Sequence, residues 1–133
     1  MNSNLRKIKV VAGVILFERK ILITKRPYNV HMGGKWEFPG GKVKKNESDI
    51  QALKRELNEE LSIHVTVNKL LLETRHFYET FEVNIFFYEC FVSSNQVSEN
   101  LVLQHKWVFP SELTAYSFPP ANEKLISLIL ENY

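Results

Sequence analysis

With 133 residues, 44% of them hydrophobic and 24% charged, the chain has the length of one domain and enough apolar material for a real core. Its formal net charge is only +2 and its basic residues are dispersed, which argues against a nucleic-acid-binding groove. A single cysteine, Cys90, excludes an internal disulfide framework, and the apolar run at 10–17 is too short to cross a membrane and lacks a signal-peptide cleavage pattern. We therefore expect one domain over residues 1–133 of a cytoplasmic protein, with neither a membrane nor a nucleic-acid polymer as partner.

The N-terminal third is predicted to consist of strands and loops. Residues 7–17 are rich in β-branched and apolar side chains and predict a buried strand, and residues 21–25 predict the second strand of a hairpin. Residues 27–35 hold proline, asparagine and two glycines and predict a loop. A short extended segment is expected at 36–38, because the residue before a proline avoids the helical region.

A central helix is predicted to begin near Ser48 and to end near Leu61. Ser48 and Gln51 have the spacing of a capping box, and Asp49 in the first turn complements the helix dipole. Apolar residues recur at helical spacing and form a stripe that we expect to be buried, namely Ile50, Leu53, Leu57 and Leu61.

The C-terminal half is predicted to hold two long strands, at about 64–78 and 82–93, and a short strand at 106–108. One helical turn is expected at 110–113, followed by a terminal helix at 120–131 that buries Leu125, Leu128 and Ile129. Strands around a central helix, with a final helix, predict an α/β (α+β) fold in which a mixed β-sheet is sandwiched between α-helices.

Three carboxylates, Glu56, Glu59 and Glu60, lie within five positions of the predicted central helix. Residues three and four apart are neighbours on a helix, so the three acids share one face. A solvated acidic face is the plain interpretation, whereas a divalent-cation site is the functional one, because hard cations such as Mg²⁺ prefer carboxylate oxygen. The cation site is favoured by Arg55 just before the cluster and by a glycine-rich loop at 39–42, whose backbone can approach a phosphate closely.

This stretch resembles the Nudix box. Six glycine or charged positions of that pattern are matched within a window of 23 residues, namely Gly41, Glu47, Arg55, Glu56, Glu59 and Glu60. One position departs from the pattern, since Ser62 stands where the family has glycine. That glycine ends the helix in a left-handed conformation, which serine adopts less readily. We therefore expect the helix end to differ here, without an effect on any metal ligand.

Two further segments are similar to those of MutT-type Nudix enzymes. Residues 31–42 are similar to the segment that leads into the box, and residues 118–123 are similar to the segment on which these enzymes carry a purine-reading asparagine, here Asn122. The similarity covers roughly residues 8–130 and implies the Nudix fold for nearly the whole chain.

The resemblance implies roles for the matching residues. Glu56 is the expected base or water-orienting residue, Arg55 would hold it by a charge-assisted bond, and Glu47 would help to orient or ligate from the helix start. The implied metal ligands are Glu56, Glu59, Glu60 and the carbonyl of Gly40. The implied substrate-binding residues are Arg26, His31, Glu37, Phe38, Gly41, Lys42 and Asn122.

Several of these residues also have plainer interpretations. Asn122 follows two prolines and is a residue type that commonly caps helices, although an amide can also read a purine edge. Lys42, with two lysines nearby, either attracts a polyphosphate or lies in a solvated loop. Arg26 and His31 lie either near the nucleotide or on the surface.

Two questions stay open on sequence grounds. Phe81, Phe86 and Phe87 could stack on a base, although aromatic residues in strands more often belong to the core. Some Nudix enzymes use an extra glutamate from a later loop. Here Glu99 serves as that acid, or His105 replaces it, or the helix acids suffice.

The resemblance implies a metal-dependent enzyme that hydrolyses a nucleoside triphosphate at the β-phosphorus to a nucleoside monophosphate and pyrophosphate, with Mg²⁺ as cofactor and Mn²⁺ as a possible substitute. A MutT-type enzyme would sanitise the nucleotide pool by removing an oxidised purine such as 8-oxo-dGTP. The alternatives are a pyrimidine nucleotide such as CTP or a modified dCTP as substrate, and a non-catalytic Nudix-fold binding module, against which the retained box acids argue. Monomer and homodimer both remain open.

Overall fold

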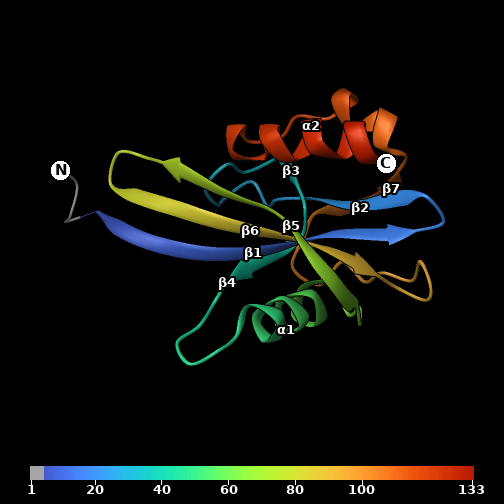
Figure 1. Cartoon of the computed structure of the whole chain (residues 1–133), viewed down its shortest axis with the longest axis horizontal. Coiled ribbons are helices and arrows are strands. Elements are labelled where there is room, and N and C mark those ends of the chain that lie inside the picture. Colours follow the sequence, from blue (N-terminus) through green and yellow to red (C-terminus); the bar gives the residue numbers. More distant parts are fainter. Residues whose placement is uncertain (1–4) are drawn as a thin grey trace.

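The computed structural model describes residues 5–133, in which one seven-stranded mixed sheet has a helix on each face (Figure 1). The expected single domain begins at residue 1, and its residues 1–4 lie outside the described residues. In chain order the elements are β1 (Arg6–Phe17), β2 (Lys20–Lys25), β3 (Trp36–Glu37), β4 (Gly40–Lys42), α1 (Asp49–Leu61), β5 (Thr66–Phe77), β6 (Phe81–Phe91), β7 (Gln104–Val108), the 3-10 helices η1 (Pro110–Ala115) and η2 (Pro120–Asn122), and α2 (Glu123–Asn132).

Strand β1 is the centre of the sheet. It pairs with β6 in parallel over its whole length, from Arg6 opposite Phe81 to Leu16 opposite Phe91. Its other edge is shared by two antiparallel partners, β4 and β2. The strand order is β3-β2-β1-β6-β5, with β4 beside β1 and β7 beside β2, which confirms the predicted mixed sheet.

Two hydrophobic cores lie on opposite faces of this sheet, because successive strand residues point to opposite sides. Val11 and Ile15 of β1 pack with the buried face of α1, whereas Ala12 and Val14 pack with the face that α2 covers. The predicted sandwich is therefore confirmed (Figure 1). Among residues 5–133 there is no helix with both the length and the apolar character needed to cross a membrane.

The glycine-rich segment at 39–42 was expected to be a loop, and this is wrong for most of it. Residues 40–42 form β4, which lies antiparallel to β1 with Gly41 opposite Val11. A Cβ atom added to Gly40 would come within 1.9 Å of the Val11 carbonyl oxygen. The glycine therefore permits a close backbone approach within the sheet, a packing requirement that the sequence pattern alone does not distinguish from loop flexibility.

The predicted capping box of α1 is confirmed. The Gln51 amide donates to Ser48 Oγ at 3.1 Å, and the Ser48 amide donates to Gln51 Oε1 at 2.9 Å. The predicted stripe is wrong at Ile50, which is 45% exposed, while Ala52 is buried instead. The residue four positions before Leu53 is Asp49. It takes the sheet-facing position on that turn and accepts a hydrogen bond from Tyr88.

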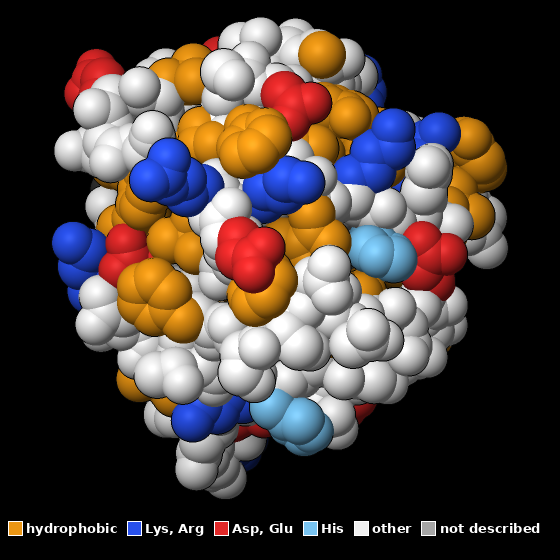
Figure 2. All heavy atoms as spheres, turned by 90° about the vertical axis from the view of Figure 1, so that its right-hand side faces the viewer, with side chains coloured by type: hydrophobic (Ala, Val, Ile, Leu, Met, Phe, Trp, Pro, Cys, Tyr) orange, Lys and Arg blue, Asp and Glu red, His pale blue; other side chains and the backbone are white. Residues whose placement is uncertain are grey.

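The remaining elements follow the expected order with shifted ends. The terminal helix α2 starts at Glu123, after the 3-10 turn η2, instead of at residue 120. Leu125 and Ile129 are buried as expected, whereas Leu128 is only partly buried. Basic, acidic and hydrophobic side chains are interspersed on the end of the molecule seen in Figure 2, in keeping with the dispersed charge of the sequence.

Replacing Leu57 by alanine should lower the free energy of unfolding by about 2–5 kcal/mol, because its fully buried side chain would leave a cavity under α1. Replacing Ile50 by alanine is the matched control on the same helix and should cost much less, since that side chain is largely solvated. Urea unfolding followed by circular dichroism would measure both values, and equal losses would contradict the described packing of α1.

Candidate active site

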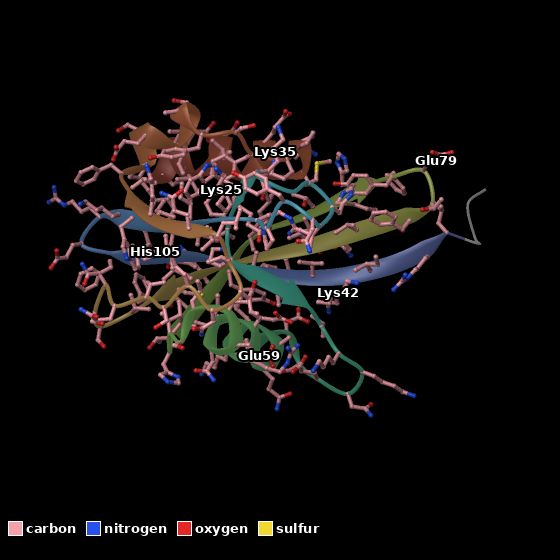
Figure 3. The ribbon with its side chains drawn as sticks, turned by 180° about the vertical axis from the view of Figure 1, so that it is seen from behind. Lys25, Lys35, Lys42, Glu59, Glu79 and His105 are labelled. Carbon is pink, nitrogen blue, oxygen red and sulfur yellow. The ribbon has the colours of Figure 1, made fainter. Side chains whose placement is uncertain are left out.

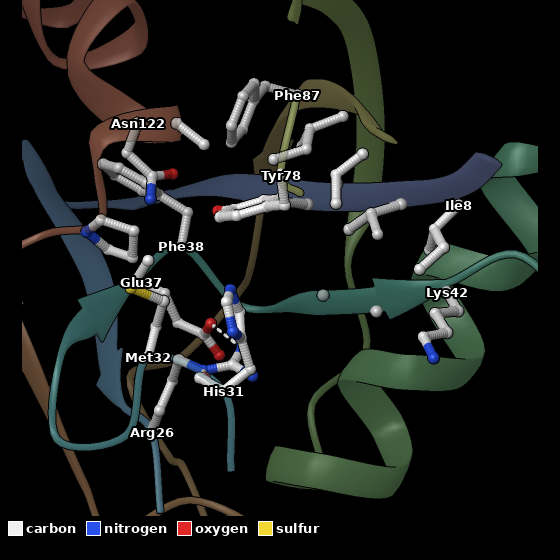
Figure 4. A pocket seen from close by; sticks show the side chains of 18 of the residues that line it. Ile8, Arg26, His31, Met32, Glu37, Phe38, Lys42, Tyr78, Phe87 and Asn122 are labelled. Atoms are coloured by element: carbon white, nitrogen blue, oxygen red, sulfur yellow. Dashed lines mark hydrogen bonds and ion pairs between the residues drawn. The ribbon is translucent and has the colours of Figure 1, made fainter. Parts of the chain in front are cut away.

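All seven residues expected to bind substrate line one cavity of about 410 Å³, which lies between the sheet, the segment 26–42 and the start of α2 (Figure 4). These residues are Arg26, His31, Glu37, Phe38, Gly41, Lys42 and Asn122. Tertiary structure thus brings together side chains that are up to 96 positions apart in the sequence, the difference between residues 122 and 26.

The floor of the cavity is apolar and comes from the two parallel strands. Three cross-strand pairs supply it, since Ile8 lies opposite Val83, Val10 opposite Ile85, and Ala12 opposite Phe87. On sequence grounds Phe87 was a candidate for base stacking, whereas the other five residues were predicted only as strand interior. These residues alternate in the sequence with residues that face α1, which was the available signal for their orientation. That alternation does not show that α2 leaves part of their face uncovered.

One wall of the cavity is aromatic. Tyr78 and Phe81 stack with ring centroids 4.7 Å apart, and His31 meets them edge-on at 4.9 and 5.8 Å. Of the three phenylalanines proposed for stacking, Phe81 and Phe87 line the cavity, whereas Phe86 packs against the α1 side. Tyr78 was missed because it was read only as the end of a strand. Burial raises the pKa of its phenol, so Tyr78 stays a hydrogen-bond donor at neutral pH.

Asn122 is buried, with 7% of its surface exposed, and its amide is directed towards the cavity (Figure 4). Although it stands at the N-cap position of α2, its side chain makes no capping hydrogen bond. The capping interpretation is therefore wrong for the residues that the structure describes. Nearby, Phe38 lines the cavity and stacks on Phe118, with ring centroids 5.3 Å apart.

The polar side of the cavity is organised by Arg26. Its Nη1 atom lies 2.6 Å from Glu37 Oε2, and its Nε donates to the His31 carbonyl at 2.8 Å (Figure 4). Burial raises the pKa of Glu37, and the Arg26 charge opposes that shift. Arg26 therefore holds both the cavity loop and an acid that faces α1.

Arg55 donates to four residues, two that precede α1 and two that lie on it. It donates two bonds to Glu47, at 2.6 and 2.9 Å, and one to the Lys42 carbonyl at 3.1 Å. Its Nη1 atom donates to Glu56 at 2.9 Å and to Glu59 at 3.3 Å. The hydrogen bonds from Arg55 lower the pKa of Glu47 to about 2, so Glu47 is ionised and anchored. The expected contact between Arg55 and Glu56 is confirmed.

Glu56 lies directly over the backbone of β4. A Cβ atom on Gly41 would fall 2.3 Å from the carboxyl carbon of Glu56. A side chain at this position would have to displace the Glu56 carboxylate, so glycine lets the acid lie against the strand without rearrangement. Gly40 beside it lines the cavity, and its role as a carbonyl ligand stays a prediction.

The three acids of α1 differ in their surroundings. Glu59 has 47% of its side chain exposed and projects from the helix (Figure 3), while Glu60 is turned inward towards Glu37. The Glu60 Oε2 atom is shielded from solvent and finds no hydrogen-bond partner in the described part of the chain. Burial, then the carboxylates of Glu37 and Glu56, raise the pKa of Glu60 to about 8.

This arrangement fits a divalent cation. A shielded carboxylate oxygen without a hydrogen-bond partner, next to two further acids, is destabilised when it is ionised, and the Arg26 charge offsets this only in part. Within residues 5–133 no three acidic, histidine or cysteine side chains already converge in a ligand cluster. In this arrangement Arg55 donates to both Glu56 and Glu59.

Comparison with known proteins identifies the architecture. The sequence model of the NUDIX domain matches residues 10–128. The chain belongs to the NUDIX domain family. It is 40% identical over 128 residues to the 8-oxo-dGTP diphosphatase of Haemophilus influenzae, covering 92% of this chain and 91% of that one.

Two other relatives extend this finding. The CTP pyrophosphohydrolase of Escherichia coli is 34% identical over 128 residues, covering 95% of this chain and 93% of that protein. The solution structure of the E. coli ORF135 protein superposes with a TM-score of 0.82 at 31% identity, over 96% of this chain and 91% of that one. The chain is thus a MutT-type Nudix pyrophosphohydrolase, and Nudix hydrolases generally depend on a divalent metal ion.

Glu99 and His105, the two candidates for an extra catalytic residue outside the box, contact each other. Glu99 Oε2 accepts from the His105 amide at 2.8 Å and lies 2.8 Å from His105 Nδ1, which lowers the pKa of Glu99. His105 pairs with Thr24, and Thr24 with Glu37, so His105 lies two strands from Glu37. In Figure 3 His105 lies towards the opposite end of the molecule from Lys42.

In metal-free protein the stability should fall as the pH rises from about 5 to about 8. Folded Glu60 keeps its proton up to about pH 8, whereas the unfolded chain releases it near the usual value of 4.5, so unfolding releases a proton throughout this window. Urea unfolding in EDTA at several pH values would measure the slope, which Glu60→Gln should reduce. Glu47 gives the opposite trend only at lower pH, since its pKa is about 2. Equal slopes in both proteins would contradict this account of Glu60.

Proposed function

We propose that this Nudix enzyme hydrolyses nucleoside triphosphates to a nucleoside monophosphate and pyrophosphate, with oxidised purine nucleotides such as 8-oxo-dGTP as preferred substrates. The observation that carries the proposal is the buried Asn122 amide, which caps no helix and faces a cavity with an apolar floor and an aromatic wall. The same cavity reaches β4, over whose backbone the Glu56 carboxylate lies.

Each part of the cavity suits one part of such a substrate. The base fits between the apolar floor and the aromatic wall, where Asn122 offers a donor and acceptors to a purine edge. The triphosphate then extends along β4, where Gly41 exposes backbone and Lys42 adds positive charge. Arg26 sets the position of His31 and Glu37 between the two regions.

The catalytic step depends on α1. Glu56, oriented by Arg55, is proposed to accept a proton from the attacking water as the water oxygen bonds to the β-phosphorus. The bond from the β-phosphorus to the oxygen that bridges it to the α-phosphorus then breaks, and the nucleoside monophosphate leaves with that oxygen. A bound divalent cation would supply charge neutralisation and a lowered pKa of bound water. We propose Mg²⁺ for this role, with Mn²⁺ as a substitute, held by Glu56, Glu59, Glu60 and the Gly40 carbonyl.

Three wider proposals accompany this function. We propose that the whole chain is a single domain, which is supported by cores that combine elements from both ends of the described sequence. We propose a cytoplasmic location and a free nucleotide instead of a nucleic-acid polymer as partner. A cavity of about 410 Å³ suits one nucleotide better than a polymer, and monomer and homodimer are both compatible with it.

A pyrimidine nucleotide is the second candidate, because the chain resembles a CTP pyrophosphohydrolase over nearly its whole length. A panel of normal and oxidised purine and pyrimidine triphosphates, assayed with Mg²⁺ for pyrophosphate release, distinguishes the two. The proposal requires the highest kcat/KM for an oxidised purine. A preference for CTP or a modified dCTP would replace it by the second candidate.

Glu56→Gln should lower kcat by about 10²–10⁴-fold, because the amide can neither accept the proton of water nor hold a cation as a carboxylate does. The far-ultraviolet circular dichroism spectrum should stay unchanged. Glu131→Gln, an exposed acid on α2, is the matched control and should keep full turnover. Near-normal turnover of Glu56→Gln would refute the assigned role.

Asn122→Ala should lower the preference for oxidised over normal guanine nucleotides by about tenfold, measured as the ratio of kcat/KM values. Asn122→Asp tests the amide donor separately, because aspartate keeps the size of the side chain but its carboxylate offers no donor to the base. Base reading requires that Asn122→Asp loses the preference as Asn122→Ala does, while the far-ultraviolet circular dichroism spectra show that both variants are folded. An unchanged preference in both variants would argue for a purely structural residue.

A further inference from the structure

The end of helix α1 has a left-handed residue that is not glycine. Ser62, the residue that departs from the box pattern, adopts φ 55° and ψ 39°. The expectation that the helix end would differ is therefore wrong for the backbone, since the left-handed ending is kept. An L-residue in this conformation costs roughly 1–2 kcal/mol, so the fold has to stabilise Ser62 by other contacts.

The segment 98–101 provides these contacts by closing the helix end. The last four carbonyls of a helix lack partners within it. In α1 the Asn58 carbonyl accepts from Ser62, as in a normal left-handed ending. The next carbonyls accept from the distant segment, that of Glu60 from two amides at 3.1 and 3.3 Å and that of Leu61 from the Ser98 amide at 2.9 Å.

Asn100 is the central residue of this closure. Its side-chain nitrogen donates to Ser62 Oγ at 2.8 Å and to the Glu59 carbonyl at 3.2 Å. Its backbone amide is one of the two donors to the Glu60 carbonyl. One residue therefore binds the left-handed serine and the backbones of two box acids, across a sequence distance of about 40 residues.

We propose that Asn100 is a positioning residue that replaces the missing box glycine and fixes Glu59 and Glu60 for cation binding. This inference rests on the proposed role of those acids. Without the Asn100 side chain, Ser62 loses the hydrogen bond that accompanies its strained conformation and the Glu59 carbonyl loses its partner. The last turn of α1 then frays, and the buried Glu60 carboxylate is no longer held beside Glu56.

The test combines Asn100→Ala, Ser62→Gly and the double variant in the full-length chain. Asn100→Ala should raise the Mg²⁺ concentration for half-maximal activity by about two- to tenfold, the value of about one hydrogen bond, with little change of kcat at saturating Mg²⁺. Binding of Mn²⁺ without nucleotide, measured by electron paramagnetic resonance, should weaken by the same factor. Ser62→Gly should restore both values in the double variant, because glycine adopts the left-handed conformation without the cost.

Asn95→Ala is the matched control, an exposed asparagine in the same connecting segment, and it should leave metal binding unchanged. The proposal would be overturned if Asn100→Ala left the Mn²⁺ affinity unchanged. It would also be overturned if the fold-changes caused by the two substitutions simply multiplied in the double variant, because the two residues would then act independently. Hydrogen exchange at the Ser62 and Ile63 amides adds a readout that does not depend on metal, and exchange in Asn100→Ala should be faster than in the parent. If the parent protein bound no Mn²⁺ but showed this exchange difference, the proposed function would fail while the closure of α1 by Asn100 would stand.

Discussion

The close approach of the Glu56 carboxylate to the backbone of β4 is the constraint on which the site depends. The acid occupies the space that a side chain on Gly41 would need, and Gly40 next to it leaves no room for a side chain against β1. Strand β4 thus contacts both the central strand β1 and, at Gly41, the acid-bearing helix α1. Any phosphate that follows this strand is brought beside the acids of α1.

The electrostatics of α1 follow from this placement. Like-charged neighbours on a helix cost about 0.2–0.5 kcal/mol per pair, and burial adds to that cost. Arg55 offsets it for Glu47, Glu56 and Glu59 through hydrogen bonds, but Glu60 faces Glu37 without such a partner. Glu60 is therefore the carboxylate whose ionised form a bound divalent cation would stabilise most.

The other half of the site is decided by packing. Parallel pairing of β1 with β6 aligns six apolar side chains on one face, and α2 covers only part of that face. The hairpin that joins β5 to β6 brings Tyr78 and Phe81 over the open part, while η2 delays the start of α2 and leaves Asn122 facing the cavity. The residues proposed to bind the base therefore lie over β1 and β6, whereas those proposed to act on the phosphates lie along β4 and α1.

The sequence by itself determined the local chemistry of this protein. Helical spacing placed the three acids and Arg55 together, the capping box located the start of α1, and apolar alternation located the strands, because these signals act over a few residues. Only the tertiary structure decided that Ile50 faces solvent and that the glycines form β4. It also decided that one carboxylate oxygen of Glu60 is shielded without a hydrogen-bond partner, and that Asn100 closes the helix around Ser62. Each of these depends on contacts between segments far apart in the chain, whose register and depth follow from the packing of the whole sheet.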